Sequence, residues 1–372
     1  MKNWIISGTF IAFIFIISLL NGLSPDRELS ETENRPLAQR PTLTVEKLIS
    51  GEFMSEFETY VTDQFLVKDW WVGLKSEAET FLQKGENNGI YFGKEGYLLE
   101  AFTSVSDQFE KNLSYLNLFH EKLPHLPTTA LFVPTAVEIY QDLLPLFAPT
   151  VNQSELLTQA SETLTFELVH PLETFLAHSN ESLFYKTDHH WTTLGAFYTY
   201  QLLMNEWNLT PYLDYTTEVV SNDFYGTYYS KANRNRLSPD QIILYHPNEK
   251  DSSLTTTFDQ TVLEGVYDLS YLNKKDKYSL FLGGNQPLTI LRSGISNGRK
   301  LVIFKDSYAH CFAPFLTKHF EEIHLIDLRY FNQNPYDYVV QESFDQVLFL
   351  YNLSTFAEEK SLIRLKAFQP TT

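Results

Sequence analysis

Ser307, His190 and Asp188 are the side chains whose types and local spacing fit nucleophilic catalysis. Ser307 follows a short apolar run, Leu301–Phe304, that favours a buried strand, and it precedes apolar residues at helical spacing from Ala309 to Phe320. A serine at the carboxyl end of a strand is exposed at the sheet edge, near the positive end of the following helix. That position suits a nucleophile whose attack creates an oxyanion, although a helix cap explains the same stretch.

A general base for Ser307 is expected from the segment Asp188–Trp191. Asp188 and His190 are two residues apart, so in an extended segment their side chains lie on one face and His189 lies on the other. An aspartate beside a histidine fixes the imidazole tautomer and stabilises its cation, which makes His190 the better candidate base. The alternative is that Asp188 merely caps the helix that begins after Trp191.

Metal binding is a second chemical interpretation of the same segment. The ligands would be Asp188, His189 and His190, with His310 or His319 added. Catalytic zinc motifs usually place their histidines on one face of a helix, which this segment does not do. The sequence therefore predicts neither a metal nor another cofactor.

Strands that alternate with helices must bring these side chains together. Strands are expected at 128–133, 183–185, 278–282, 301–304, 323–328 and 347–351, and helices at 106–123, 152–177 and 193–207. Such alternation predicts an α/β fold in three layers, with a mainly parallel sheet covered on both faces. Residues 218–278 interrupt it with Tyr, Thr, Asn and Asp and are expected to form an inserted β-rich lobe.

The amino terminus predicts a membrane segment. The run 4–23 is almost wholly apolar and long enough to cross a bilayer as a helix, and the residues after it make a poor cleavage site. We expect an uncleaved single-pass anchor at 1–24, a linker and helical segment at 25–95, and an α/β catalytic domain at 96–372. The weak charge bias around the anchor favours an extracytoplasmic catalytic domain.

Composition excludes nucleic acid as a partner and disulfide bonds as the source of stability. The net charge of −18 would repel nucleic acid, and the single cysteine, Cys311, excludes an intramolecular disulfide framework. With 43% hydrophobic residues, the 372-residue chain can bury a substantial core.

Several short motifs occur in the order seen in one bacterial family. Asp-His-His-Trp at 188–191 resembles the signature of the DHHW family, a branch of the SGNH-hydrolase-like proteins that includes the alginate O-acetylation proteins. Asp-Ser-Tyr at 306–308 is similar to the later Asp-Ser-Phe of those relatives. Further matches lie at 33–36, 133–135, 224–231 and 326–329. Lys305 departs from the pattern, because the ordinary SGNH nucleophile block has glycine there.

The resemblance implies an SGNH-hydrolase-like, flavodoxin-like fold and an acetyl-serine mechanism. Ser307 would attack an acetyl ester, His190 would remove its proton and Asp188 would hold His190. The Ser307 N–H is expected to meet the oxyanion, and the further oxyanion or substrate candidates are Gly284, Asn285, Gly226, Asn352, Lys231, Arg329 and Tyr308. Gly284 and Asn285 could equally belong to an ordinary turn.

Two functions are consistent with these residues. The first is a membrane-anchored extracytoplasmic O-acetyltransferase or acetylesterase acting on a cell-surface polysaccharide, with a membrane-bound O-acyltransferase as the acetyl donor. The second is a non-catalytic glycan-binding or assembly protein on a degenerate scaffold, an interpretation that Lys305 favours. Transfer to water and transfer to a sugar hydroxyl are not distinguished by the sequence.

Overall fold

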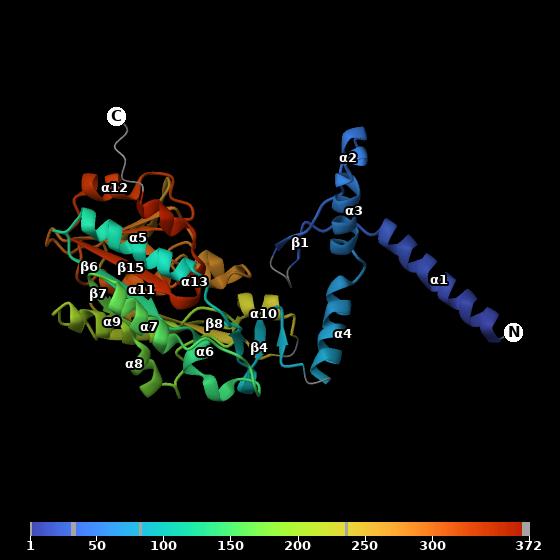
Figure 1. Ribbon diagram of the computed structural model, residues 1–372, viewed down its shortest axis with the longest axis horizontal. Helices are drawn as coiled ribbons and strands as arrows, with labels where there is room; N and C mark the ends of the chain where they lie inside the picture. Colours follow the sequence, from blue (N-terminus) through green and yellow to red (C-terminus); the bar gives the residue numbers. More distant parts are fainter. Residues whose placement is uncertain (1, 31–34, 82–83, 235–236, 367–372) are drawn as a thin grey trace. The chain divides into compact units, whose positions relative to one another are not determined.

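Two compact units make up the chain in the computed structural model (Figure 1). The N-terminal unit comprises Met1–Asn87 and Ser230–Leu237, and the C-terminal unit comprises Asn88–Tyr229 and Ser238–Thr372. The structure describes all residues except 1, 31–34, 82–83, 235–236 and 367–372. Glu33 and Asn34 of the motif at 33–36 therefore lie outside the described residues.

The N-terminal unit contains the helix that the apolar amino terminus predicts. Its elements are α1 (Lys2–Leu23), β1 (Leu29–Ser30), β2 (Arg35–Pro36), α2 (Val45–Ser50), α3 (Glu52–Asp63), α4 (Lys68–Phe81) and β3 (Glu86–Asn87). Within α1, Trp4–Leu23 is long and apolar enough to cross a membrane, and none of it is buried. A membrane anchor and a signal sequence both have this length and composition.

An eight-stranded sheet organises the C-terminal unit, in the order β11-β10-β12-β14-β13-β15-β6-β7. These strands are β6 (Thr128–Val133), β7 (Glu167–Val169), β10 (Thr255–Phe258), β11 (Thr261–Glu264), β12 (Leu288–Arg292), β13 (Lys300–Lys305), β14 (Glu322–Ile326) and β15 (Gln346–Asn352). The five strands from β14 to β7 are parallel, and the other three pair antiparallel. The carboxyl ends of β13, β14, β15 and β6 consequently meet at one edge.

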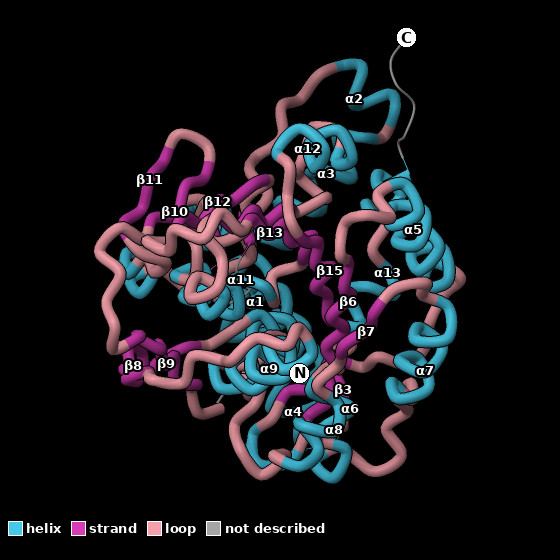
Figure 2. Tube along the Cα trace, turned by 90° about the vertical axis from the view of Figure 1, so that its left-hand side faces the viewer, coloured by secondary structure: helices cyan, strands magenta, loops and turns pink. Residues whose placement is uncertain are grey.

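Helices cover both faces of this sheet. They are α5 (Gln108–Lys122), α6 (Ala136–Ile139), α7 (Gln153–Thr163), α8 (Leu172–Ala177), α9 (Thr193–Glu206), α11 (Ala309–Leu316), α12 (Pro335–Glu342) and α13 (Leu353–Glu358). Figure 2 shows α5, α7 and α13 on one side of β13, β15, β6 and β7, and α9 and α11 on the other. The central strands are buried along almost their whole length, as expected for parallel strands covered on both faces. The prediction of a mixed α/β fold with a mainly parallel sheet is confirmed.

Smaller elements complete the C-terminal unit. They are β4 (Ile90–Phe92), η1 (Lys94–Gly96), β5 (Leu98–Glu100), η2 (Gln141–Leu143), β8 (Tyr215–Phe224), α10 (Thr227–Ala232), β9 (Asp240–Pro247), η3 (Leu269–Asn273), η4 (Lys277–Leu280) and η5 (Ser361–Lys366), with α10 continuing into the N-terminal unit. The expected lobe at 218–278 is divided in the structure. β8 and β9 pair as a separate antiparallel hairpin, whereas β10 and β11 extend the main sheet.

Three element predictions were wrong. The helix expected at 152–177 is interrupted by β7, which pairs with β6, and Pro171 disfavours helical backbone at the residue before it. The strand expected at 278–282 is the 3₁₀ helix η4, because the positive φ angles of Leu282 and Gly283 turn the chain back. Residues 183–185 form only one isolated bridge, between Phe184 and Trp191.

We predict that the aromatic contacts across one face of the sheet dominate its stability. Phe119 of α5 is fully buried and packs edge-on against Phe304 and Phe349. Phe119→Ala should lower the free energy of unfolding by about 3–5 kcal/mol, because it removes these contacts and leaves a cavity. Phe147→Ala is the control, since that ring is 98% exposed and should contribute less than about 0.5 kcal/mol. Denaturant unfolding of both variants tests this, and equal losses would contradict it.

Candidate active site

Ser307 lies in a tight turn between β13 and α11, at the carboxyl edge of the sheet. Asp306 holds this turn against the neighbouring strand. One of its carboxylate oxygens accepts the Tyr308 N–H at 2.8 Å, and the other accepts the backbone and side-chain N–H groups of Asn352, both at 2.8 Å. Asp306 is buried, whereas Ser307 remains partly exposed. The turn that carries the Ser307 hydroxyl is therefore held in place by the hydrogen bonds of Asp306 to Tyr308 and Asn352.

The segment Asp188–Trp191 lies at the end of a narrow loop. The Tyr185 N–H donates to the His190 carbonyl at 3.2 Å, and the Thr192 N–H donates to the Leu183 carbonyl at 2.8 Å. Asp240 supports the loop by accepting the backbone N–H groups of Lys186 and Thr187, each at 2.8 Å. These hydrogen bonds close the loop on itself, so its side chains are held on a rigid support.

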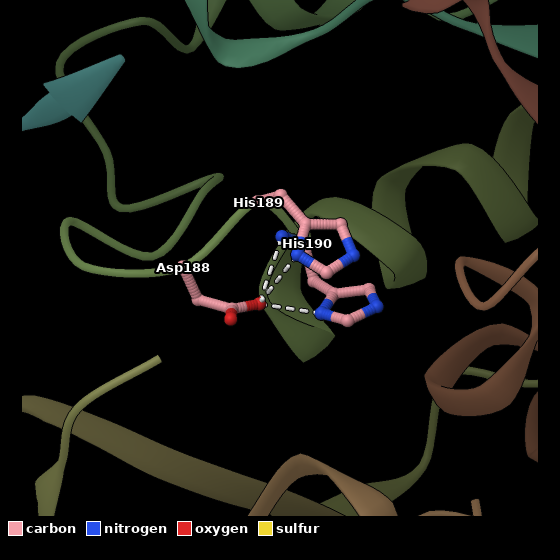
Figure 3. A group of neighbouring side chains, drawn as sticks. All are labelled: Asp188, His189 and His190. Carbon is pink, nitrogen blue, oxygen red and sulfur yellow. Dashed lines mark hydrogen bonds and ion pairs between the residues drawn. The ribbon is translucent and has the colours of Figure 1, made fainter. Parts of the chain in front are cut away.

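The structure brings Ser307 to His190 and Asp188, which lie more than a hundred residues earlier in the chain. His190 Nε2 lies 2.7 Å from Ser307 Oγ, and His190 Nδ1 lies 2.5 Å from Asp188 Oδ1. Figure 3 shows the Asp188 carboxylate directed at His190, with His189 beside it. This is the geometry of a serine hydroxyl, an imidazole base and a carboxylate that orients the base.

The Asp188 carboxylate is fully engaged. Oδ1 also accepts the His190 N–H at 3.0 Å, while Oδ2 accepts the N–H and hydroxyl of Thr227 at 2.7 and 3.0 Å. Burial alone would raise the pKa of Asp188. The neighbouring His189 and His190 and the donated hydrogen bonds outweigh burial and lower that pKa, so the carboxylate is ionised at neutral pH.

Reciprocal hydrogen bonds join the Asp188–Trp191 loop to the serine turn. The Trp191 indole N–H donates to the Tyr308 carbonyl at 3.0 Å, and the Tyr308 hydroxyl donates to the His189 carbonyl at 2.5 Å. Trp191 and Tyr308 are both buried, and their rings lie 5.2 Å apart. We call this pair of hydrogen bonds the clasp. Tyr308, expected near the oxyanion or substrate, instead uses its hydroxyl in the clasp.

Two of the predicted donors, Gly226 and Asn352, use their N–H groups in other hydrogen bonds. Gly226 donates its N–H to Thr187 and lies against Asp188, so it leaves room for the carboxylate. The side-chain amide of Asn352 donates to Asp306 and to Thr355, each at 2.8 Å. Both N–H groups of that amide are thus committed to holding the strand end.

Gly284 and Asn285 belong to the turn after η4. Gly284 has a φ angle of +80°, and Asn285 is exposed. A Cβ on Gly284 would lie 2.7 Å from Ser279 Oγ, which gives this glycine a steric reason to be there. The turn interpretation therefore accounts for both residues.

The two predicted cationic candidates differ in their surroundings. Arg329 forms a bidentate pair with Asp327, with nitrogen–oxygen distances of 2.9 and 2.6 Å, and this contact raises the pKa of the guanidinium. Lys231 is exposed in α10 and belongs to the N-terminal unit.

The metal interpretation is tested by the contacts of the same side chains. Asp188, His189 and His190 each offer a ligand atom within 4.8 Å of the others. Both ring nitrogens of His190, however, already face Ser307 and Asp188. His310 and His319, the proposed extra ligands, bond instead to Lys305 and Tyr200. The arrangement fits the orientation of an imidazole better than the coordination of an ion.

Sequence reasoning missed two residues that contact the site. Thr227 binds the Asp188 carboxylate, and the matched motif at 224–231 was the available signal for it. Tyr278 stacks on the His190 ring with centroids 3.6 Å apart and planes at 11°. No short-range pattern indicates Tyr278, because it lies in the 3₁₀ helix η4, 88 residues after His190, and meets that ring only in the folded chain.

Comparisons with known proteins identify the fold and the family. A DHHW protein family profile matches residues 132–326. A DHHW family protein from Eubacterium siraeum DSM 15702 is 27% identical, with a TM-score of 0.66 over 76% of this chain and 96% of that chain. Bacillus cereus PatB1, solved with a sulfonyl adduct, is 21% identical, with a TM-score of 0.59 over 72% and 97% of the two chains.

A weaker similarity is to the O-acetyltransferase domain of Pseudomonas putida AlgJ, which is 13% identical with a TM-score of 0.48 over 75% of this chain and 98% of that domain. A search of curated proteins found no match. The fold is SGNH-hydrolase-like, with its mainly parallel sheet and covering helices. The chain belongs to the DHHW family.

We predict that Gly226→Ala displaces Asp188. An added Cβ would lie 2.2 Å from both Cβ and Oδ2 of that residue. The substitution should cost about 1–3 kcal/mol of stability by overpacking, and it should slow the reaction of Ser307 with a fluorophosphonate at least tenfold. Gly22→Ala is the control, because its backbone, like that of Gly226, lies outside the left-handed region and a Cβ at Gly22 would meet no atom within 4 Å. Equal labelling rates in the two variants would contradict the prediction.

Proposed function

We propose that this protein transfers acetyl groups to or from a polysaccharide hydroxyl through an acetyl-serine intermediate on Ser307. The observation that supports this most strongly is the 2.7 Å separation between Ser307 Oγ and His190 Nε2, with Asp188 on the opposite nitrogen. The resemblance of the DHHW family to the O-acetylation branch of SGNH-like proteins supports acetyl as the group transferred.

In the first half of the reaction, Ser307 Oγ forms a bond to the carbonyl carbon of an acetyl ester. His190 Nε2 takes the hydroxyl proton, and Asp188 stabilises the imidazolium through Nδ1–H. The bond from the carbonyl carbon to the donor oxygen then breaks, and His190 returns the proton to that oxygen. The products are acetyl-Ser307 and the free donor alcohol.

The second half of the reaction reverses these steps with a different alcohol. His190 removes a proton from an acceptor hydroxyl, whose oxygen attacks the acetyl carbon. The bond from that carbon to Ser307 Oγ then breaks, and His190 returns the proton to Oγ. A sugar hydroxyl as acceptor makes the protein an O-acetyltransferase, and water makes it an acetylesterase. The Ser307 backbone N–H, at the start of the turn before α11, is proposed to donate to the oxyanion in both halves.

A cell-surface polysaccharide is the proposed acceptor, and α1 is the proposed anchor. Trp4–Leu23 has the length and composition of a bilayer-spanning helix. An anchored catalytic domain outside the cytoplasm would work where cytoplasmic acetyl donors are absent. A membrane-bound O-acyltransferase is therefore the proposed source of the acetyl group.

Active-site labelling tests the catalytic role of Ser307. The full chain should react with a fluorophosphonate probe at Ser307, located by peptide mapping, and should release p-nitrophenol from p-nitrophenyl acetate. Ser307→Ala should abolish both reactions, whereas Ser354→Ala should retain them, because the Ser354 hydroxyl contacts Glu100 and not His190. A folded wild-type chain that neither labels nor turns over would favour the non-catalytic glycan-binding alternative.

A polysaccharide acceptor distinguishes the two forms of the reaction. If the protein is a transferase, added cell-wall polysaccharide should accelerate p-nitrophenol release and gain alkali-labile acetyl groups. Acetate as the sole acetyl product, at a rate independent of added polysaccharide, would instead assign esterase activity.

A further inference from the structure

Lys305 is the last residue of β13, two residues before Ser307, and its side chain is buried. Only 1% of its side chain is exposed, and Nζ lies 2.6 Å from Nε2 of His310 and 3.6 Å from Oδ2 of Asp327. Asp327 is separately held by the bidentate Arg329. A buried ammonium is costly unless it is paired and hydrogen-bonded, and Asp327 and His310 are the partners that Lys305 has here.

The contact with Lys305 determines where His310 carries its proton. An ammonium group donates hydrogen bonds and accepts none, so Nε2 of His310 must be the acceptor. A neutral imidazole that accepts at Nε2 carries its hydrogen at Nδ1. Burial and the positive charge of Lys305 lower the pKa of His310 well below its usual value, which keeps the ring neutral. His310 therefore presents one donor, Nδ1–H, away from Lys305.

His310 borders the proposed reaction site. Its backbone N–H donates to the Ser307 carbonyl at 3.2 Å, so the two residues belong to one turn at the start of α11. The ring of Tyr278 connects the two histidines. It stacks on His190 at 3.6 Å and lies 6.3 Å from His310, with planes at 27°. His310 thus shares a turn with Ser307 and shares the neighbour Tyr278 with His190.

We propose that Lys305 is a positioning residue that holds His310 as an Nδ1–H donor, and that this donor stabilises the oxyanion formed when Ser307 attacks the acetyl carbonyl. The inference rests on the acetyl transfer proposed above. It gives Lys305 a function where the ordinary SGNH pattern has glycine. It also adds a donor to the Ser307 N–H, whereas Gly226 and Asn352 use their N–H groups in other hydrogen bonds.

The charges around Lys305 give the proposal a pH dependence. His310 faces it from α11, Asp327 and Arg329 follow β14, and Asp306 and Tyr351 lie at the ends of β13 and β15. Burial lowers the pKa of Lys305 to about 8, with Asp327 opposing the effect. Lys305 is therefore protonated below pH about 8. Above it, the neutral amine both donates and accepts, so the His310 tautomer is no longer imposed.

Nitrogen NMR of the full chain, with ¹⁵N-labelled histidine and in detergent, reads the tautomer without any substrate. Below pH 8, His310 should be neutral and protonated at Nδ1, and the Nδ1–H population should fall as the pH rises through about 8. In Lys305→Met the Nδ1–H preference should be lost. Asp327 keeps its Arg329 partner in this variant, so the fold is expected to survive. A predominantly Nε2-protonated ring in the wild type at pH 7 would overturn the proposal.

The rate of acetyl-Ser307 formation from p-nitrophenyl acetate measures whether His310 and Lys305 stabilise the oxyanion. His310→Leu and Lys305→Met should each lower it about 100-fold, the usual effect of losing one oxyanion donor. His310→Asn should recover at least tenfold over His310→Leu, because its amide N–H replaces Nδ1–H. Adding Lys305→Met to His310→Asn should change the rate less than threefold. Lys300→Met is the control on the same strand, with a side chain 35% exposed, and should match the wild type.

The outcomes separate this inference from the proposed function. Normal acetylation of Ser307 in His310→Leu and Lys305→Met would overturn the inference and leave acetyl transfer standing. No acetylation in the wild type would overturn both. If Lys305→Met does not fold, the wild-type rate still decides the question. That rate should fall above pH about 8 in parallel with the Nδ1–H population, and a rate without that decline would overturn the inference.

Discussion

The clasp between Trp191 and Tyr308 is the contact on which the arrangement of the site depends. His190 and Ser307 are separated by 117 residues, and neither local segment alone determines their distance. Two hydrogen bonds join the loop and the turn, from the Trp191 indole to the Tyr308 carbonyl and from the Tyr308 hydroxyl to the His189 carbonyl. Because both side chains are buried, water does not compete for these bonds, and each half of the site fixes the other.

Two buried ionisable groups near the site, Asp188 and Lys305, differ in how well their charged forms are stabilised. Asp188 is buried but receives four hydrogen bonds, so its carboxylate is held in the charged form. Lys305 is buried with fewer partners, and its pKa falls to about 8. Both side chains receive their contacts from residues of other segments: Asp188 from Thr227, and Lys305 from His310 and Asp327. The parallel topology matters because it gathers the ends of β13, β14 and β15 at the carboxyl edge of the sheet.

The fold and the three central side chains were predictable because their signals are local. Apolar runs predicted β6, β13, β14 and β15, and the two-residue spacing of Asp188 and His190 predicted their shared face. The oxyanion candidates were not predictable in the same way. Whether the Asn352 amide is available depends on Asp306, and the role of Gly226 depends on its contact with Asp188. These are contacts across long sequence separations, which periodicity does not encode.

A double substitution of the clasp tests the central claim most directly. Trp191→Phe combined with Tyr308→Phe keeps the aromatic volume and removes both hydrogen bonds. The variant should still unfold in one cooperative transition, while the second-order rate of Ser307 modification by a fluorophosphonate should fall at least tenfold below the wild type. A rate equal to that of the wild type in the folded double variant would show that the clasp does not align His190 with Ser307.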